Sequence, residues 1–304
     1  MNSLFAEFAK FMWGPWMLIL LLGTGLWLSI CLRGIQIRSL AYAFQLTFSK
    51  ERDGDGDISH FGSLMTSLAA TVGTGNIAGV STAVALGGPG AIFWMWVTGL
   101  VGMATKYAEG FLAIKYRDVN KHGEISGGPM YYLEFGLKQK WLGILFAIFG
   151  ALAAFGIGNM IQSNTIASSL SKTLGTNDFL VGVILAFLTG MVVLGGIKRI
   201  ASVTSYFVPL MVLIYFIGAT FVILNNLSHL SSGIALILEH AFTGTAATGG
   251  FAGATLAQTI RFGVARGLFS NESGMGSAPI VAAAARTNHP EKQALVSMTG
   301  TFLD

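Results

Sequence analysis

Long apolar stretches alternate with short polar segments along the whole chain. Runs long enough to cross a membrane occupy, approximately, residues 12–32, 61–86, 91–114, 141–170, 178–197, 203–225 and 262–285. A spanning α-helix needs about 20 predominantly apolar residues. The pattern therefore predicts an all-α polytopic membrane protein.

An eighth apolar run begins near Ala294 and reaches Asp304, the last residue. A helix that stopped inside lipid would leave backbone groups unpaired. We therefore expect the chain to be a fragment of a longer protein.

Basic residues gather in every second connection between the runs. Arg33, Arg38, Lys50 and Arg52 follow the first run, and Lys115, Arg117, Lys121, Lys138 and Lys140 follow the third. Lys198 and Arg199 follow the fifth run, and Arg286 and Lys292 follow the seventh. Basic loops stay in the cytoplasm, which places the N-terminus outside. A span across Ile234–Ile260, which contains Glu239 and His240, would break this alternation. We therefore interpret residues 229–260 as an external amphipathic or re-entrant segment.

The composition agrees with a bilayer environment and excludes several classes of function. Charged residues make up 11% of the chain and hydrophobic residues 53%, whereas a typical soluble domain is about 25% charged. The net charge of +4 is explained by the cytoplasmic loops rather than by a nucleic-acid surface. The sequence contains no P-loop and no metal-ligand spacing of its histidines, so we expect neither an ATP motor nor an enzyme, and no cofactor.

The chain resembles itself when it is shifted by 201 residues. The matched pairs are Phe61-Gly62 with Phe262-Gly263, Gly73 and Gly75 with Gly274 and Gly276, Val80 with Val281, Ala83 with Ala284, and Thr98-Gly99 with Thr299-Gly300. Five predicted spans lie from the start of the first copy to the start of the second, and this odd number turns the second copy over in the membrane. Inverted repeats are typical of secondary transporters. Chance similarity between two glycine-rich helices is the alternative, but the loop charges independently give the two copies opposite directions.

The first copy carries a glycine-rich break at Thr71–Gly79. Its three glycines each weaken a helix by about 1 kcal/mol relative to alanine. Carbonyls freed by unwinding can coordinate a cation, and freed amides can hold a carboxylate. Thr71, Thr74 and Asn76 add further oxygen and amide groups. Close helix packing through Gly75 and Gly79 is the alternative, but the mirrored second break favours a binding site.

The second break, Phe269–Pro279, contains Glu272 near the predicted middle of the membrane. Pro279 suits the first turn of a restarted helix. Ionisable residues inside a membrane usually mark an ion or substrate route. Glu272 could bind a cation, receive a substrate ammonium or act as a protonated gate, and a structural salt bridge to Arg266 or Lys106 remains equally open.

Two other spans carry polar residues. In the fourth span, Gln162 is the best candidate for a pocket contact among a cluster of amides and hydroxyls that no single helix face can hold. In the third span, Lys106 and Glu109 lie three residues apart. This spacing predicts an ion pair at the cytoplasmic membrane edge rather than a transport site.

At these residues the sequence resembles the alanine or glycine:cation symporter family, also called sodium:alanine symporters. The most specific match is Gly87–Gly102, supported by Gly75–Gly79, Ala108–Phe111, Gly127–Tyr132 and Asn271–Gly274. The resemblance covers essentially the whole chain. It implies a LeuT-like inverted repeat of five plus five helices, preceded here by one extra helix and truncated after the start of the second repeat.

The resemblance also implies roles for individual residues. The amides around Thr74 and Gly75 would hold a substrate carboxylate, with Asn76 and Gln162 nearby. Phe269 would be an aromatic gate, and Gly274, Met275 and Gly276 would lie beside the substrate. The implied sodium ligands are the carbonyls of Ala69 and Val72, together with Thr71, Asn76 and Ser270. Glu272, a potential charge relay or gate, stands where the similar neurotransmitter:sodium symporters have a small polar residue.

The resulting expectation is a sodium-coupled symporter that imports alanine or glycine by alternating access. Residues 1–52 would form the extra helix and a cytoplasmic loop, 53–228 the first repeat, 229–260 the external segment and 261–304 the start of the second repeat. We expect a monomer or weak oligomer surrounded by lipid in a bacterial or archaeal cytoplasmic (inner) membrane, without a nucleic-acid partner. Proton coupling, a non-transporting amino-acid sensor and a channel are the alternatives.

Overall fold

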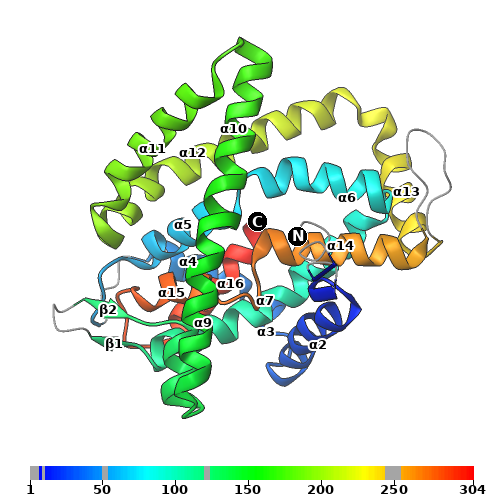
Figure 1. Cartoon of the computed structure of the whole chain (residues 1–304). Coiled ribbons are helices and arrows are strands. Elements are labelled where there is room, and N and C mark those ends of the chain that lie inside the picture. The colour runs from blue at the N-terminus through cyan, green and yellow to red at the C-terminus, as the bar shows by residue number, and fades with distance from the viewer. Residues whose placement is uncertain (1–6, 9–10, 50–53, 120–123, 244–254) are drawn as a thin grey trace.

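Helices of unequal length make up nearly all of the structure, which is a computed structural model (Figure 1). It describes residues 7–8, 11–49, 54–119, 124–243 and 255–304. The first helices are α2 (Pro15–Cys31), α3 (Ile35–Arg38), α4 (Leu40–Phe48), α5 (His60–Thr71), the π-helix η1 (Gly75–Gly79), α6 (Val80–Gly87) and α7 (Ala91–Lys115).

A short antiparallel hairpin and a second set of helices follow α7. The hairpin pairs β1 (Asp118–Val119) with β2 (Ile125–Ser126). The helices are α8 (Pro129–Tyr131), η2 (Tyr132–Gly136), α9 (Lys140–Ala153), η3 (Ala154–Gly158), α10 (Asn159–Leu174), α11 (Asp178–Val193), α12 (Gly196–Asn225), η4 (Leu227–His229), α13 (Leu230–Thr243), α14 (Leu256–Asn271), α15 (Ala278–Ala283) and α16 (Pro290–Leu303).

Several of these helices have the length and composition of membrane spans. Among the described residues, Lys140–Leu174 and Gly196–Asn225 pass on length and apolar character, and α5 with η1 and α6 forms one further span bent by 51°. α2 and α11 are apolar but shorter, with 17 and 16 residues. The protein is thus a multi-pass membrane protein, and the predicted run at 262–285 is divided into α14 and α15 by a non-helical segment.

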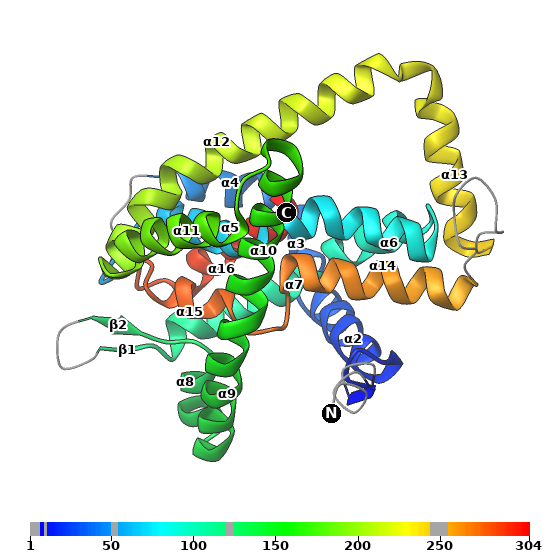
Figure 2. The ribbon, with the colours of Figure 1, turned by 45° about the horizontal axis from the view of Figure 1, so that its top comes forward.

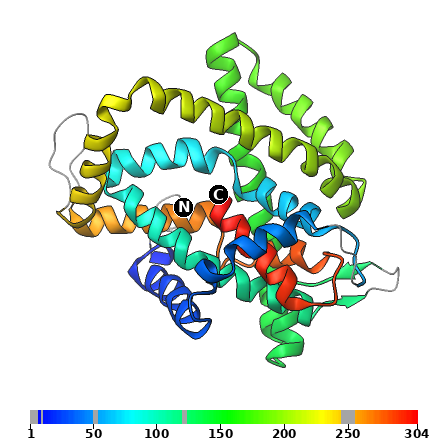
Figure 3. The same ribbon diagram turned by 180° about the vertical axis from the view of Figure 1, so that it is seen from behind.

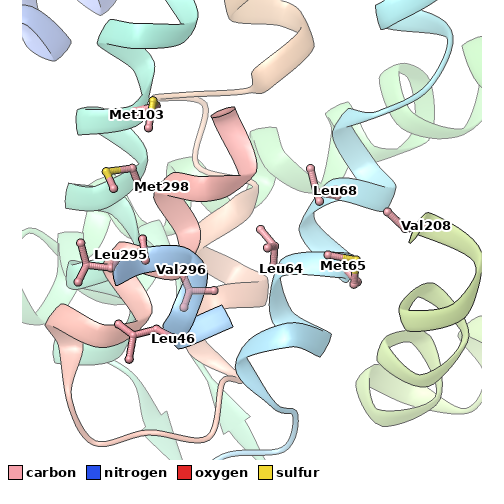
Figure 4. Packing of buried hydrophobic residues seen from close by; sticks show 10 residues of the cluster. Leu46, Leu64, Met65, Leu68, Met103, Val208, Leu295, Val296 and Met298 are labelled. Atoms are coloured by element: carbon pink, nitrogen blue, oxygen red, sulfur yellow. The ribbon is translucent and has the colours of Figure 1, made fainter. Parts of the chain in front are cut away.

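The segment after the first span differs from its prediction. We expected a cytoplasmic loop, but residues 35–48 are almost entirely helical. Ala43, Leu46 and Thr47 of α4 are buried, and α4 contacts α5 and α16. Figure 4 shows Leu46 in the core cluster that also holds Leu64 and Val296. The apolar face of this short helix packs on a core that exists only after the rest of the chain has folded.

The two broken helices lie against each other in opposite directions (Figures 1 and 2). α5 contacts α15, and α6 contacts α14, so the first half of each broken helix meets the second half of the other. Figure 3 shows α16 lying along α7. Positions 102 and 110 of α7 leave no room for a side chain. A Cβ added at Gly102 would stand 2.8 Å from Ser273 Oγ, and one added at Gly110 would stand 2.7 Å from Ser297 Oγ. The second break and α16 therefore both pack closely against α7.

Arg117 fastens the two broken helices together at one end of the molecule. Its guanidinium donates to the carbonyls of Ala283 and Ala285 at 2.9 and 2.8 Å, and to those of Asp55 and Thr287 at 2.8 and 2.7 Å. Burial lowers the pKa of the Arg117 guanidinium, and the neighbouring Asp55 carboxylate opposes this effect. A planar fork of five N–H donors suits such a ring of carbonyls. We call this arrangement the Arg117 junction.

Replacing Arg117 by lysine should destabilise the fold, because an ammonium cannot reach four carbonyls in different directions. We expect Arg117→Lys to lower the free energy of unfolding by about 2 kcal/mol, as is typical for charged hydrogen bonds. Thermal unfolding in detergent would measure the change. The control is Arg199→Lys on α12, where the arginine is exposed. Equal melting temperatures for both variants would contradict the role of the junction.

Candidate functional site

A cavity of about 660 Å³ opens where the two broken helices meet. Its polar lining comes from both breaks and from the end of α16: Gly73, Asn76, Ser270, Asn271 and Asp304. The rest is largely apolar and includes Met95 and Trp96 of α7 and Tyr215 of α12. Apolar walls with a few converging polar groups are typical of small-molecule sites.

The first break is held open by side-chain amides. The Gly73 amide donates to Asn76 Oδ1 at 2.9 Å, and the Thr74 amide donates to Gln162 Oε1 at 3.3 Å. Val72 has an extended backbone, which ends α5. Gln162 comes from α10, far away in the sequence; it meets the break but is not among the residues that line the cavity. Backbone groups that the unwound segment cannot pair internally are thus satisfied by other residues.

Asp304 lies at the centre of the polar lining, and sequence reasoning overlooked it. Asn76 Nδ2 donates to its carboxyl Oδ1 at 3.0 Å. The Thr71 and Ser270 side chains lie near this carboxyl group and interact with it favourably. The available signal was an acidic residue at the end of a predicted membrane run, which is costly in lipid and often functional.

Three of the predicted cation ligands therefore come together. Thr71, Asn76 and Ser270 all contact the Asp304 carboxyl group, although they belong to different helices. Val72 lines the same cavity, whereas Ala69 is exposed on α5. Hydroxyl, amide and carboxylate oxygens are suitable ligands for a hard cation. In the described part of the chain, no group of three His, Cys, Asp or Glu side chains could hold a metal ion.

The second break has a different geometry and faces other elements. Gly274 and Gly276 have φ values of +83° and +82°, a region that disfavours side chains. The Gly276 amide donates to Glu109 Oε1 at 3.1 Å. Neither glycine lines the main cavity, and neither does Met275. A Cβ at Gly276 would stand 2.7 Å from Phe146 and Pro129, so this part of the break packs closely against α8 and α9.

Glu272 caps the end of α14 in a left-handed conformation with φ at +53°. Its carboxylate accepts a hydrogen bond from the Ser277 hydroxyl across the break. Of the two salt bridges left open by the sequence, with Arg266 or with Lys106, neither forms within 4.0 Å. The side-chain hydrogen bond of Glu272 is therefore made to another residue of the second break, Ser277.

The predicted ion pair of Lys106 and Glu109 at the membrane edge is wrong. Both side chains are buried, with 3% and 7% of their surface exposed. They form no salt bridge within 4.0 Å, and Lys106 Nζ has no hydrogen-bond partner in the described structure. The spacing of the two residues along α7 could not reveal their burial. The Glu109 carboxylate instead accepts a hydrogen bond from the Gly276 amide of the second break.

Phe269 lies beside a separate cavity of about 230 Å³. Its ring centroid is 6.1 Å from that of Trp13 and 5.1 Å from the Arg266 guanidinium carbon. The guanidinium lies directly over Gly79, where an added Cβ would collide with it. This explains the last glycine of the first break by close packing, which was the alternative to a binding role.

Removing the Gln162 amide should loosen the first break. In Gln162→Leu the Thr74 amide loses its acceptor, and a hydrogen bond of this kind contributes about 1 kcal/mol. We expect the amides of residues 71–79 to exchange hydrogen about fivefold faster, as measured by mass spectrometry. Asn164→Leu makes the matched change at an exposed position of α10 and should leave the exchange unchanged. Equal exchange in both variants would contradict the contact.

Comparison with known proteins identifies relatives over the whole chain. The sequence profile of the sodium:alanine symporter family matches residues 1–304. The sodium/alanine symporter AgcS of Methanococcus maripaludis is 55% identical over 301 residues, which cover 97% of this chain and 66% of that protein. An uncharacterized transporter of Haemophilus influenzae is 51% identical over 304 residues, which cover 100% and 67%.

A more distant relative is named for another amino acid. The probable sodium/glutamine symporter GlnT of Bacillus subtilis is 41% identical over 294 residues, covering 96% of this chain and 60% of that protein. The chain spans about two thirds of the length of the curated relatives it matches. The resemblance first suggested by the glycine-rich motifs is confirmed by the profile and the relatives together, and the chain belongs to the sodium:alanine symporter family.

Proposed function

We propose that the protein is a sodium-coupled symporter that imports alanine or glycine by alternating access. One observation carries the proposal: two oppositely directed broken helices meet at a cavity whose polar lining converges on Asp304. Unwound segments of this kind supply carbonyls for a coupling ion and amides for a substrate carboxylate. The site has no nucleophile and base in catalytic order, which disfavours an enzyme.

The coupling ion is proposed to bind at Asp304. An isolated carboxylate is costly in a membrane interior, and a sodium ion would neutralise it. The side chains of Thr71, Asn76 and Ser270 already surround this carboxyl group, and the carbonyls of Ala69 and Val72 would complete the ligand set. Occupation by sodium would stabilise the unwound backbone in its substrate-binding form.

The substrate is proposed to bind at the first break. Its carboxylate would take the amides of Thr74 and Gly75, with Asn76 and Gln162 fixing the geometry. The volume of about 660 Å³ is ample for a small amino acid. One of these relatives is named for alanine and another for glutamine, and the higher identity of the alanine symporter favours a small side chain.

The remaining assignments follow from the family resemblance. Phe269 is proposed as an aromatic gate, Gly274, Met275 and Gly276 as substrate neighbours in another state of the transport cycle, and Glu272 as a charge relay. We also propose the LeuT-like inverted repeat with one preceding helix, an outside N-terminus and a cytoplasmic (inner) membrane location. Rocking of the two halves around a fixed site would then expose it alternately.

Uptake in proteoliposomes tests the coupling ion and the cargo. With the intact protein and an inward sodium gradient, we expect labelled alanine or glycine to accumulate at least tenfold above the level with choline in place of sodium. A proton gradient imposed alone separates the proton-coupled alternative. Flux down the alanine gradient without counterflow would indicate a channel, and binding without any flux would indicate a sensor. Excess unlabelled glutamine should compete weakly.

Neutralising Asp304 should weaken sodium binding more than alanine binding. Asp304→Asn keeps the size of the side chain and its contact with Asn76, but it removes the negative charge. We expect the half-saturating sodium concentration to rise at least tenfold, which corresponds to about 1.4 kcal/mol, while the alanine KM at saturating sodium changes less than threefold. The matched control, Asp178→Asn at the start of α11, should change neither. An unchanged sodium dependence would place the ion elsewhere.

A further inference from the structure

One face of α7 is shaped to receive the second break. Gly102 leaves room for Ser273 of the break, Gly110 leaves room for Ser297 of α16, and Ala113 packs with Ala282 and Ala283 of α15. Lys106 and Glu109 lie between these positions on the same side of the helix, because residues three, four and seven apart share a face. The ionisable side chains of this face are therefore enclosed by the break together with α15 and α16.

Glu109 holds the backbone of the second break. Its Oε1 accepts a hydrogen bond from the Gly276 amide at 3.1 Å, and the Gly274 backbone lies near the same carboxylate. Both glycines adopt positive φ angles, so this backbone has no helical partners of its own. The role that Asn76 and Gln162 play at the first break falls to a charged residue at the second.

Lys106 is a buried basic residue that interacts electrostatically with several acidic side chains. Glu109, Glu272 and Asp304 are the acidic side chains that act electrostatically on its ammonium group. Nζ is buried and lacks a hydrogen-bond partner within the described ranges. A buried charge of either sign is costly without a compensating one. The acidic side chains of this group outnumber its basic ones by three to one, so removal or addition of a single charge should change how strongly the group attracts a cation.

Neither residue lines the main cavity. An effect of Lys106 or Glu109 on transport must therefore pass through the break or through the electrostatic field. The link to the proposed cation site is direct, since Asp304 belongs both to that site and to the surroundings of Lys106.

We propose that Lys106 and Glu109 are a pair of positioning residues: Glu109 fastens the second break, and Lys106 is a resident cation that sets how strongly the Asp304 site attracts sodium. The role in sodium binding rests on the proposed function. The role in holding the break does not.

The test measures sodium dependence in proteoliposomes containing the intact protein. Lys106→Met removes a positive charge, so the half-saturating sodium concentration should fall at least threefold. Glu109→Gln removes a negative charge but keeps an oxygen for the Gly276 amide, so this concentration should rise at least threefold. The double variant Lys106→Met/Glu109→Gln should return to within twofold of the original value. Shifts of opposite sign that cancel are not expected from altered packing alone.

A second double variant separates charge from hydrogen bonding. Lys106→Met/Glu109→Met is equally neutral but offers the Gly276 amide no acceptor. We expect its maximal uptake rate to be at least tenfold below that of Lys106→Met/Glu109→Gln, with an alanine KM changed less than threefold. Equal rates for the two double variants would overturn the role of Glu109. Single-variant shifts of the same sign would overturn the role of Lys106.

Thermal unfolding of the same variants in detergent without sodium does not depend on transport. Each single variant should melt at least 5 °C below the original protein, because it removes the opposite charge that offsets part of the burial cost of the other residue, and Lys106→Met/Glu109→Gln should recover at least half of that loss. If the melting pattern holds and the original protein shows no sodium-dependent uptake, the proposed function is wrong and the buried pair stands. If uptake is sodium-dependent and the double variant recovers neither stability nor sodium affinity, the pair is wrong.

Discussion

Every polar backbone group inside a membrane protein needs a partner, and this constraint governs the two broken helices. A continuous helix supplies partners from its own backbone, but an unwound segment must obtain them from elsewhere. At the first break the partners are neutral amides, from Asn76 of the break itself and Gln162 of α10. At the second they include the charged Glu109 of α7. The functional site therefore depends on residues outside the segments that form it.

The difference between the breaks gives each a distinct character. The first faces the cavity, where Val72, Gly73 and Asn76 belong to the lining. The second is enclosed by α7, α8 and α9, where Phe146 and Pro129 approach Gly276 closely. The first break is thus next to the cavity. The second break connects the end of α14 to α7 through the Glu109 hydrogen bond. Sequence repetition does not reveal this asymmetry, because both breaks share the same glycine spacing.

The sequence could predict features that depend on local composition. Runs of apolar residues indicated the spans, and glycine-rich interruptions indicated both breaks at the correct positions. Features that depend on tertiary contact were beyond such reasoning. α4 was missed because its apolar face is short, Asp304 because it lies at the end of a run, and the environment of Lys106 because i,i+3 spacing suggested a pair within one helix. The span that contributes Gln162 was identified from the sequence. The hydrogen bond that Gln162 accepts from the Thr74 amide was not.

The hydroxyl groups beside Asp304 have a property that bears on how quickly such a site can exchange its occupant. A hydroxyl is donor and acceptor on one atom, and its hydrogen turns freely about the C–O bond. The hydroxyls of Thr71 and Ser270 lie near the carboxyl group, and rotation of each about its C–O bond would turn a lone pair toward a positive ion. Entry and departure of a cation then reorient protons before any heavy atom has to move. Rotations of this kind take picoseconds to nanoseconds, so the slow step of a cycle would lie with the helices and not with the ligands.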